Sequence, residues 1–385
     1  MLIETSRICG RGLLHGIAEY SRLHGPWVFY RTLLSYRQPR RKKDILSALK
    51  DWTADAIIID DTFYPAKSEE RDEIIAMGLP TIAVAIEAQI PGVANIITNG
   101  EIIGKMAAEH LLERGLTNFA YCGFDDIFWS QERSQSFSKT VAKAGFKTNF
   151  YKQPRSSLKR LWKNEQNVMA DWLKALSKPV GLMACNDDRA QQVIDACKLA
   201  NIKISDEIAI IGVDNDELVC GLTDPPLSSV ALNFERAGYE SAKLLDRLMT
   251  NKKVSNPSIM VLATHIATRQ STDMLAIEDK QVAQAVHFII HNAKQSIQVS
   301  DVVDATVLSR RVLERRFRNL VGRSIHDEIR RVRVEQIILL LLETNLSVSK
   351  IAFALGYPGI DHIARYFRRE KGISLQAYRK KYGNK

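Results

Sequence analysis

One pattern of arginine, phenylalanine, glycine and serine occurs twice near the C-terminus of the chain. A self-match at a fixed period indicates one supersecondary unit used twice. Each copy combines a short apolar helix, a tight turn and an arginine-rich helix, which is the order of a helix-turn-helix. Such a unit offers contact with DNA. The first copy contains Arg315, Phe317, Arg318, Gly322 and Ser324, and the second, 50 positions later, contains Arg365, Phe367, Arg368, Gly372 and Ser374.

The outward faces of the two arginine-rich helices carry the residues expected to meet DNA. Arginine can hydrogen-bond O6 and N7 of guanine, and glutamate can accept a hydrogen bond from N4 of cytosine. Basic residues nearer the helix ends are expected to meet phosphates instead. The expected base contacts are Arg310, Arg311, Glu314 and Arg315 in the first unit and Ile360, Asp361, Ala364 and Arg365 in the second, and the expected phosphate contacts are Arg318, Arg323, Arg368 and Arg369.

The two copies are not equivalent at their outward positions. Asp361 places an acid where the helix would face phosphates, which it repels. Either the second unit reads bases weakly, or Asp361 caps its helix. We therefore expect the first unit to do most of the base reading. Phe317 and Phe367, by contrast, are expected to face inward as core residues.

The net charge is concentrated on the same segment. The whole chain carries a formal charge of +10. Residues 276–385 contain 20 Lys and Arg against 11 Asp and Glu, so this segment contributes +9. A basic domain beside a nearly neutral one points to a polyanion as the partner of that domain alone.

Residues 1–270 alternate strand-like and helix-like segments, which predicts parallel sheets covered by helices. Apolar runs occur at 56–59, 81–86, 119–122, 180–184 and 208–213, and residues 2–4 resemble the end of a first strand. Ligands of such sheets bind beyond the carboxyl ends of the strands. The polar residues that follow these runs are therefore candidate site residues: Asp60, Asp61, Asn186, Asp187, Asp214 and Asn215.

Helix signals define the rest of the chain. We expect a sensor domain over 1–270, a polar linker over 271–279 and an all-α domain over 280–385. Within the last domain the pattern predicts a first helix over 281–292. Serines at later helix starts are expected caps. These are Ser300, Ser309, Ser324, and either Ser347 or Ser349.

The C-terminal segment resembles the DNA-binding domain of AraC/XylS-type regulators over about residues 280–383. The matching residues are Ile351-Ala352-Phe353-Ala354-Leu355-Gly356-Tyr357-Pro358, Arg365-Tyr366-Phe367-Arg368-Arg369 and Gly372-Ile373-Ser374-Leu375-Gln376-Ala377-Tyr378-Arg379. The resemblance implies two helix-turn-helix units joined by one long helix. It also implies double-stranded operator DNA as a partner.

Residues 1–270 resemble the sugar-binding core of LacI/GalR-type repressors, which is similar to periplasmic binding proteins. The matching residues are Ala184-Cys185-Asn186-Asp187, Gly212-Val213-Asp214-Asn215 and Asp224-Pro225-Pro226-Leu227-Ser228-Ser229-Val230. The resemblance implies a two-lobed α/β fold that binds a small sugar, a pentose or related monosaccharide, between its lobes. It assigns sugar contacts to Arg133, Asn186 and Asp214, and the wider candidate set adds Ser6, Arg7, Asp60, Phe128, Trp129 and Asp187.

Two other functional classes compete with this interpretation. Gly10, Gly12 and Gly16 have a dinucleotide-binding spacing, and Arg31 could meet a 2′-phosphate, as in an NADP-dependent dehydrogenase. However, a nucleotide-binding glycine should follow its strand directly, and residues 5–9 intervene here. An architectural DNA-binding protein without a ligand is the other alternative. It would not need convergent Asn, Asp and Arg side chains.

Composition narrows the remaining roles. The sequence contains no run of about 18 apolar residues, so it predicts no membrane span. The five cysteines lack paired spacing, which is typical of a cytoplasmic protein without disulfides or a zinc site. His287 and His291 could form half of a metal site, but no Glu or Cys completes it. We therefore expect a cytoplasmic transcription regulator, most simply an activator that acts as a homodimer with RNA polymerase, and no enzyme activity, cofactor, metal or membrane partner.

Overall fold

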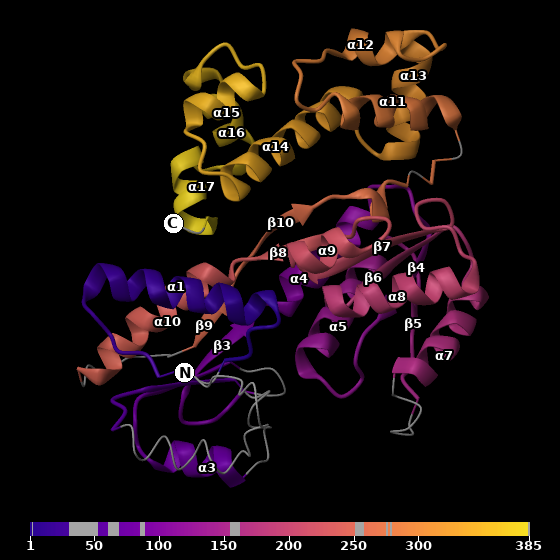
Figure 1. The fold of residues 1–385 in the computed structure, drawn as a ribbon. Helices are drawn as coiled ribbons and strands as arrows, with labels where there is room; N and C mark the ends of the chain where they lie inside the picture. The colour runs from indigo at the N-terminus through magenta and orange to yellow at the C-terminus, as the bar shows by residue number, and fades with distance from the viewer. Residues whose placement is uncertain are drawn as a thin grey trace. The chain divides into compact units, whose positions relative to one another are not determined.

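The computed structural model describes residues 1, 3–30, 53–60, 69–84, 89–154, 162–250, 258–274, 276–277 and 279–383 (Figure 1). The chain forms two compact units. Unit 1 contains Met1–Ile102, Phe124–Arg133 and Leu232–Ala263, and unit 2 contains Ile103–Gly123, Ser134–Ala231 and Thr264–Lys385. Unit 2 therefore combines an α/β part with the whole helical C-terminal domain.

Unit 1 is built on a parallel sheet. Among the described residues it has the strand order β1-β2-β3-β9. Ile57, Ile59, Ile74, Ala83 and Ile90 form one buried cluster there. Its elements are β1 (Ile57–Asp60), β2 (Thr81–Val84), β3 (Ala94–Thr98), β9 (Ile259–Val261), α1 (Ile8–His24), α3 (Glu69–Ala76) and α10 (Phe234–Met249). Ile3 is buried but lies outside any strand, so the expected first strand is not observed at residues 3–4.

Glycines allow α1 and α10 to approach closely within unit 1. A Cβ at Gly16 would lie 1.9 Å from the carbonyl oxygen of Glu235, and a Cβ at Gly238 would lie 2.1 Å from that of Leu13. Both positions therefore exclude any side chain. The glycine spacing of α1 is a helix-packing pattern inside a helix, so the dinucleotide-binding interpretation is wrong. Arg31 lies outside the described residues.

The α/β part of unit 2 is a second sheet. In the described segments its strand order is β10-β8-β7-β6-β4-β5. The strand order reverses between β4 and β6, and ligands of doubly wound sheets bind at such a switch point. The strands are β4 (Asn118–Cys122), β5 (Thr148–Phe150), β6 (Val180–Ala184), β7 (Ile208–Asp214), β8 (Ser228–Leu232) and β10 (Ala263–Ala267), and the helices are α4 (Gly100–Leu112), α5 (Phe128–Lys143), α7 (Trp162–Ala175), α8 (Asp187–Ala200) and α9 (Glu217–Leu222), with a 3₁₀ turn, η1 (Gln270–Thr272).

The C-terminal domain is entirely helical across the described residues, as expected. Its long helix α14 (Ile325–Glu343) passes from one group of helices to the other (Figure 1). Phe317 and Phe367 are both 0% exposed, which confirms the prediction that they are core residues. The other helices are α11 (Lys280–His291), α12 (Val299–Asp304), α13 (Arg310–Val321), α15 (Val348–Ala354), α16 (Ile360–Lys371) and α17 (Leu375–Tyr382).

The serine caps were predicted with mixed success. The side chains of Ser324 and Ser347 accept hydrogen bonds from the amides of Asp327 and Lys350, so both caps are confirmed. Ser309 precedes α13 but makes no capping bond. The prediction for Ser300 is wrong. The N-cap is Gln298, two residues earlier, where Gln298 and Asp301 form a capping box, and α12 begins at Val299.

Candidate functional site

Three of the candidate ligand contacts, Ser6, Arg7 and Asp60, belong to unit 1. The amide of Glu4 donates to Oδ2 of Asp60 over 3.4 Å, which brings the segment before α1 to the carboxyl end of β1. Ser6 and Arg7 follow on that segment and are exposed, whereas Asp60 is buried. The segment that carries the Ser6 hydroxyl and the Arg7 guanidinium is therefore tied to the buried Asp60 carboxylate through Glu4.

A second group of candidates lies on the first turns of α5, which belong to unit 1 up to Arg133, whereas the rest of the helix belongs to unit 2. The guanidinium of the buried Arg133 lies over the ring of Trp129, 4.6 Å from its centroid. Phe124 meets Trp129 edge-to-face, with the ring centroids 6.3 Å apart. Phe128, in the helix's first turn, is half-buried. An aromatic face beside hydrogen-bond donors suits a sugar, which has apolar ring faces and hydroxyl edges.

In unit 2, Asn186 follows β6 and caps α8. Its Oδ1 accepts a hydrogen bond from the amide of Arg189 over 2.9 Å. The structure thus gives Asn186 a helix-capping role. Because Oδ1 is occupied, the Nδ2 amide is the part of the side chain that could still donate to a ligand.

Asp187 is positioned differently from the expected ligand contact. Its side chain is buried, and its two oxygens accept hydrogen bonds from the amide of Asp216 at 2.8 Å and from Oγ of Ser229 at 2.6 Å. Burial, and then the charge of Asp214, raise the pKa of Asp187 well above its ordinary value. The prediction that Asp187 contacts the ligand is therefore revised, because one oxygen already binds the loop after β7 and the other binds Ser229 on β8.

That loop is backbone-strained at Asp214 and Asn215. Their φ angles are +106° and +56°, in the region that side chains other than glycine rarely adopt. The loop is held by Oγ of Ser229, which accepts from the Asn215 amide at 3.0 Å, and by Arg269, whose Nη2 donates to Oδ1 of Asn215 at 2.8 Å. The partly exposed Asp214 thus stands at the carboxyl end of β7 on a fixed backbone.

The residues expected to face DNA in the first helix-turn-helix are exposed on α13. Arg310, Arg311, Glu314 and Arg315 are all exposed, and Arg318 is exposed nearer the helix end. Nε of Arg310 lies 2.9 Å from Oε1 of Glu314, so these two side chains already bind each other. Arg311 and Arg315 form no ion pair with any residue the structure describes. They are therefore the more available donors for base edges.

Most of the residues expected to face DNA in the second helix-turn-helix are exposed on α16. Ile360, Asp361 and Arg365 are exposed, and Ala364 is half-buried. Asp361 does not cap the helix. Gly359 occupies the N-cap, and Asp361 lies in the first turn, where its charge complements the helix dipole. Arg368 and Arg369 are exposed near the C-terminal end of α16.

Arg323 departs from its expected role as a phosphate contact. It bonds Oε2 of Glu328, a carboxylate that is 1% exposed, and its Nη1 lies 3.8 Å from Oε1 of Glu113. A guanidinium held by two carboxylates is neutralised locally and is poorly placed for an anion. We therefore remove Arg323 from the set of DNA contacts.

His287 and His291 form a stacked pair on α11. Their ring centroids are 4.7 Å apart and their Nδ1 atoms 3.1 Å apart. Within the described part of the chain, no group of three or more His, Cys, Asp or Glu side chains could hold a metal ion. Nor does any described helix combine the length and apolar character of a membrane span.

Comparisons with known proteins match both halves of this architecture. Residues 108–272 match the periplasmic binding protein-like domain, and residues 302–381 match a helix-turn-helix domain. The chain is 30% identical to the xylose operon regulatory protein of Escherichia coli (strain K12), over 98% of this chain and 96% of that protein. The chain belongs to the xylose operon regulatory protein family. The family member from Haemophilus influenzae is 32% identical over 78% of this chain and 79% of its own.

Solved structures agree with membership of the xylose operon regulatory protein family. One described as the xylose-binding transcription activator XylR has a TM-score of 0.59 and 28% identity, and covers 99% of this chain and 97% of that one. A LacI-type regulator from Alkaliphilus metalliredigens, bound to D-xylulofuranose, has a TM-score of 0.53 at 20% identity, covers 71% of this chain and 97% of its own, and supports the sensor fold. This member of the family is thus a sugar-gated transcription regulator with an α/β sensor and a double helix-turn-helix domain.

Sequence reasoning missed the residues that support these sites in this family member. Arg269 holds Asn215, and Glu113 pairs with arginines of the helical domain. Neither residue belongs to a motif. Arg269 lies two residues before the expected linker, and only the fold shows which strand end it reaches.

Proposed function

We propose that this regulator binds a monosaccharide, with D-xylose as the first candidate, at the strand ends that carry Asn186 and Asp214. The observation that carries the proposal is the strained, fixed loop at Asp214, because strain of this kind persists where function requires it. The xylose named in the descriptions of the relatives supports this choice of sugar.

The proposed chemistry follows from the donors and acceptors available. The Asp214 carboxylate can accept hydrogen bonds from two sugar hydroxyls, and Nδ2 of Asn186 can donate to a third oxygen. Asp187 fixes the loop and stays out of contact with the sugar. For the unit 1 candidates a ligand contact stays a prediction from the family resemblance: Ser6, Arg7, Asp60, Phe128, Trp129 and Arg133.

The proposed DNA contacts are made by α13 and α16. Arg311 and Arg315 read bases, with Arg310 and Glu314 joining once their mutual ion pair opens. On α16, Arg365 makes the main contact, Ile360, Asp361 and Ala364 face the groove, and phosphates are held by Arg318, Arg368 and Arg369. With 19 residues, α14 spans about 28 Å, close to the roughly 34 Å between major grooves one turn apart.

The biological action proposed is activation of sugar-utilisation genes in the cytoplasm, by a homodimer that works with RNA polymerase. Sugar binding must favour one arrangement of the protein over another, because a ligand with equal affinity for both arrangements regulates nothing.

We place the end of the sensor at Thr272, whose side chain still bonds inside the sensor, and the start of the DNA-binding domain at Lys280, where α11 begins.

A thermal-shift screen against monosaccharides tests the sugar assignment. D-xylose at about 100 times its Kd should stabilise the protein by about 2.7 kcal/mol, and L-xylose, its mirror image, should not. A screen in which no monosaccharide raises the melting temperature would overturn the proposal.

A further inference from the structure

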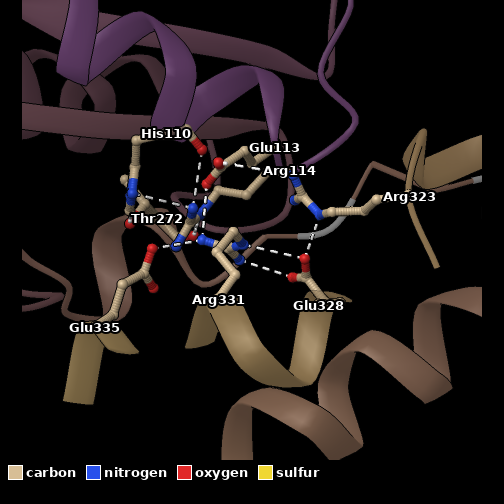
Figure 2. Close-up of polar contacts among 8 residues, drawn as sticks. All are labelled: His110, Glu113, Arg114, Thr272, Arg323, Glu328, Arg331 and Glu335. Carbon is tan, nitrogen blue, oxygen red and sulfur yellow. Dashed lines mark hydrogen bonds and ion pairs between the residues drawn. The ribbon is translucent and has the colours of Figure 1, made fainter. Parts of the chain in front are cut away.

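An ion pair joins the sensor part of unit 2 to its helical domain. Nη1 of Arg331, on α14, lies 2.8 Å from Oε2 of Glu113, in the turn that follows α4 (Figure 2). The two side chains are 23% and 27% exposed, so water screens the pair less than an ordinary surface pair. Residues 218 positions apart in the chain meet here.

Arg331 is held rigidly on its own helix. Its Nη2 lies 2.7 Å from Oε1 of Glu328, its Nε lies 3.0 Å from Oε2 of the same residue, and its Nη1 lies 2.5 Å from Oε1 of Glu335. Burial alone would raise the pKa of Glu328, but Arg331 and Arg323 hold it below its ordinary value. The guanidinium therefore has one orientation, and Glu113 meets a preformed partner.

The turn beside Glu113 is fixed from the sensor side as well. Nε of Arg114 donates to the carbonyl of Thr272 at 2.6 Å, and its Nη1 donates to the carbonyl of His110 at 2.9 Å. Nε2 of His110 lies 3.0 Å from Oγ1 of Thr272, and burial lowers the pKa of His110 well below its ordinary value, which keeps the ring neutral. Figure 2 shows these groups converging on the same point as Arg331.

The same segment leads back to the candidate sugar site. Thr272 also bonds Oγ of Ser228 at 2.7 Å, next to Ser229, which holds the Asn215 amide. Arg269 donates to both the Leu227 carbonyl and Oδ1 of Asn215. A continuous set of hydrogen bonds therefore runs from the residue after Asp214, through residues 269–272, to the turn that carries Glu113.

The far end of α14 also lies close to the sensor. Nε2 of His265, on β10, lies 3.0 Å from Oε1 of Glu343, the last residue of α14. Because α14 contributes to the cores of both helix-turn-helix units, a contact that moves α14 moves α13 and α16 with it.

We propose that the Glu113–Arg331 pair, here called the α4–α14 clamp, transmits sugar occupancy from the end of β7 to the DNA-binding domain. The inference rests on the proposed function. A ligand that shifts the Asp214 loop moves residues 269–272, the clamp moves with them, and α14 changes the presentation of both reading helices. Both partners of the clamp are held in place, Arg331 on α14 and Glu113 in the turn after α4. The contact can therefore shift the equilibrium between two arrangements of the DNA-binding domain.

The test uses the full chain and a duplex that the wild-type protein selects from a random-sequence library. Fluorescence anisotropy gives the DNA affinity with and without D-xylose, and calorimetry gives the D-xylose affinity. Glu113→Gln keeps the shape of the side chain and removes its charge. Glu109→Gln is the matched control, because Glu109 lies one turn earlier on α4 and pairs only with Lys105 among the described residues, with both side chains largely exposed.

In Glu113→Gln, the fold-change in DNA affinity caused by D-xylose should fall by about three- to tenfold, the size of a coupling between contacting groups. D-xylose affinity and the Glu109→Gln response should stay at wild-type values. Adding Arg331→Gln to Glu113→Gln should cause no further loss of coupling. Two results would overturn the clamp. One is an unchanged sugar response in Glu113→Gln, and the other is a further loss of the sugar response when Arg331→Gln is added to Glu113→Gln.

A wild-type protein that binds the selected duplex but ignores D-xylose would contradict the proposed function and not the clamp. In that case the sugar-free DNA affinity decides. A shift of about threefold or more in Glu113→Gln, absent in Glu109→Gln, supports control of α14 by the clamp. Equal affinities in both variants refute it.

Discussion

Val332 and Val334 lie two positions apart on α14 and pack into two different hydrophobic cores. Val332 belongs to a core with Leu313 and Phe317, and Val334 belongs to one with Ile363 and Phe367. The helix therefore packs against both helix-turn-helix motifs. Each motif has a hydrophobic core of its own, which includes the inner face of α13 or of α16. Separate cores on one rigid helix let each unit hold its own shape while the helix sets their spacing.

A substitution in one of the two cores should destabilise only the helix-turn-helix unit that contains it. Phe317→Ala and Phe367→Ala each remove a fully buried ring, and each should cost about 3–5 kcal/mol of stability. Hydrogen exchange should show lost protection in α11–α13 for the first variant and in α15–α17 for the second. Equal loss across both units in either variant would show one common core instead.

The two reading helices should contribute unequally to sequence selectivity. Arg315→Ala should cost about 1–3 kcal/mol of DNA binding and relax selectivity at one base pair, because Arg315 is exposed and unpaired among the described residues. Arg365→Ala should relax selectivity less. Library selection with each variant measures this, and uniform weakening across all sequences by Arg315→Ala would make Arg315 a phosphate contact.

The stability of the DNA-binding domain should fall in acid because of Glu328. Its pKa is lowered in the folded protein relative to its ordinary value of 4.5. A depressed carboxyl pKa contributes stability above the unfolded value, and this stability is lost as the pH falls through the folded value. Chemical denaturation at pH 7 and at progressively lower pH should show the decline. Glu328→Gln should be less stable at pH 7 and show a flatter profile below pH 4.5, and a variant with the wild-type slope would contradict the assignment.

Close helix packing in unit 1 should not tolerate a side chain at Gly16. Gly16→Ala places a Cβ 1.9 Å from the Glu235 carbonyl oxygen, so the melting temperature should drop, with a cost of about 1–3 kcal/mol or more. Gly221→Ala is the control, since nothing lies within 4 Å of its Cβ position. A Gly16→Ala protein as stable as the wild type would refute the packing role.

The sequence predicted features that depend on residues close together in the chain better than features that depend on residues far apart in it. Local signals such as the Ser324 cap and the inward phenylalanines were predicted because a few neighbouring residues determine them. The short strand β5 and the edge strands β9 and β10 were missed, because three to five residues carry little periodicity and pair through the fold. Asp60, Asn186 and Asp214 do end or follow strands, as predicted.

Long-range contacts account for the site residues whose partners the sequence did not predict. Arg323 looked like a phosphate contact because it is an arginine near a helix end, but Glu113 and Glu328 reach it through folding. Asp187 sits beside Asn186 in sequence, yet its carboxylate turns inward to Ser229, on a different strand. Spacing along the chain could not reveal either partner.

The most direct test of sugar-gated DNA binding compares Asp214→Ala with Asp206→Ala. These acids flank the same strand, β7, at opposite ends, and Asp206 is exposed. DNA affinity is measured with and without D-xylose. Wild type and Asp206→Ala should respond by a similar factor, about 5- to 150-fold. Asp214→Ala should bind DNA as the sugar-free wild type does and show no response, and a wild-type response in Asp214→Ala would contradict the account.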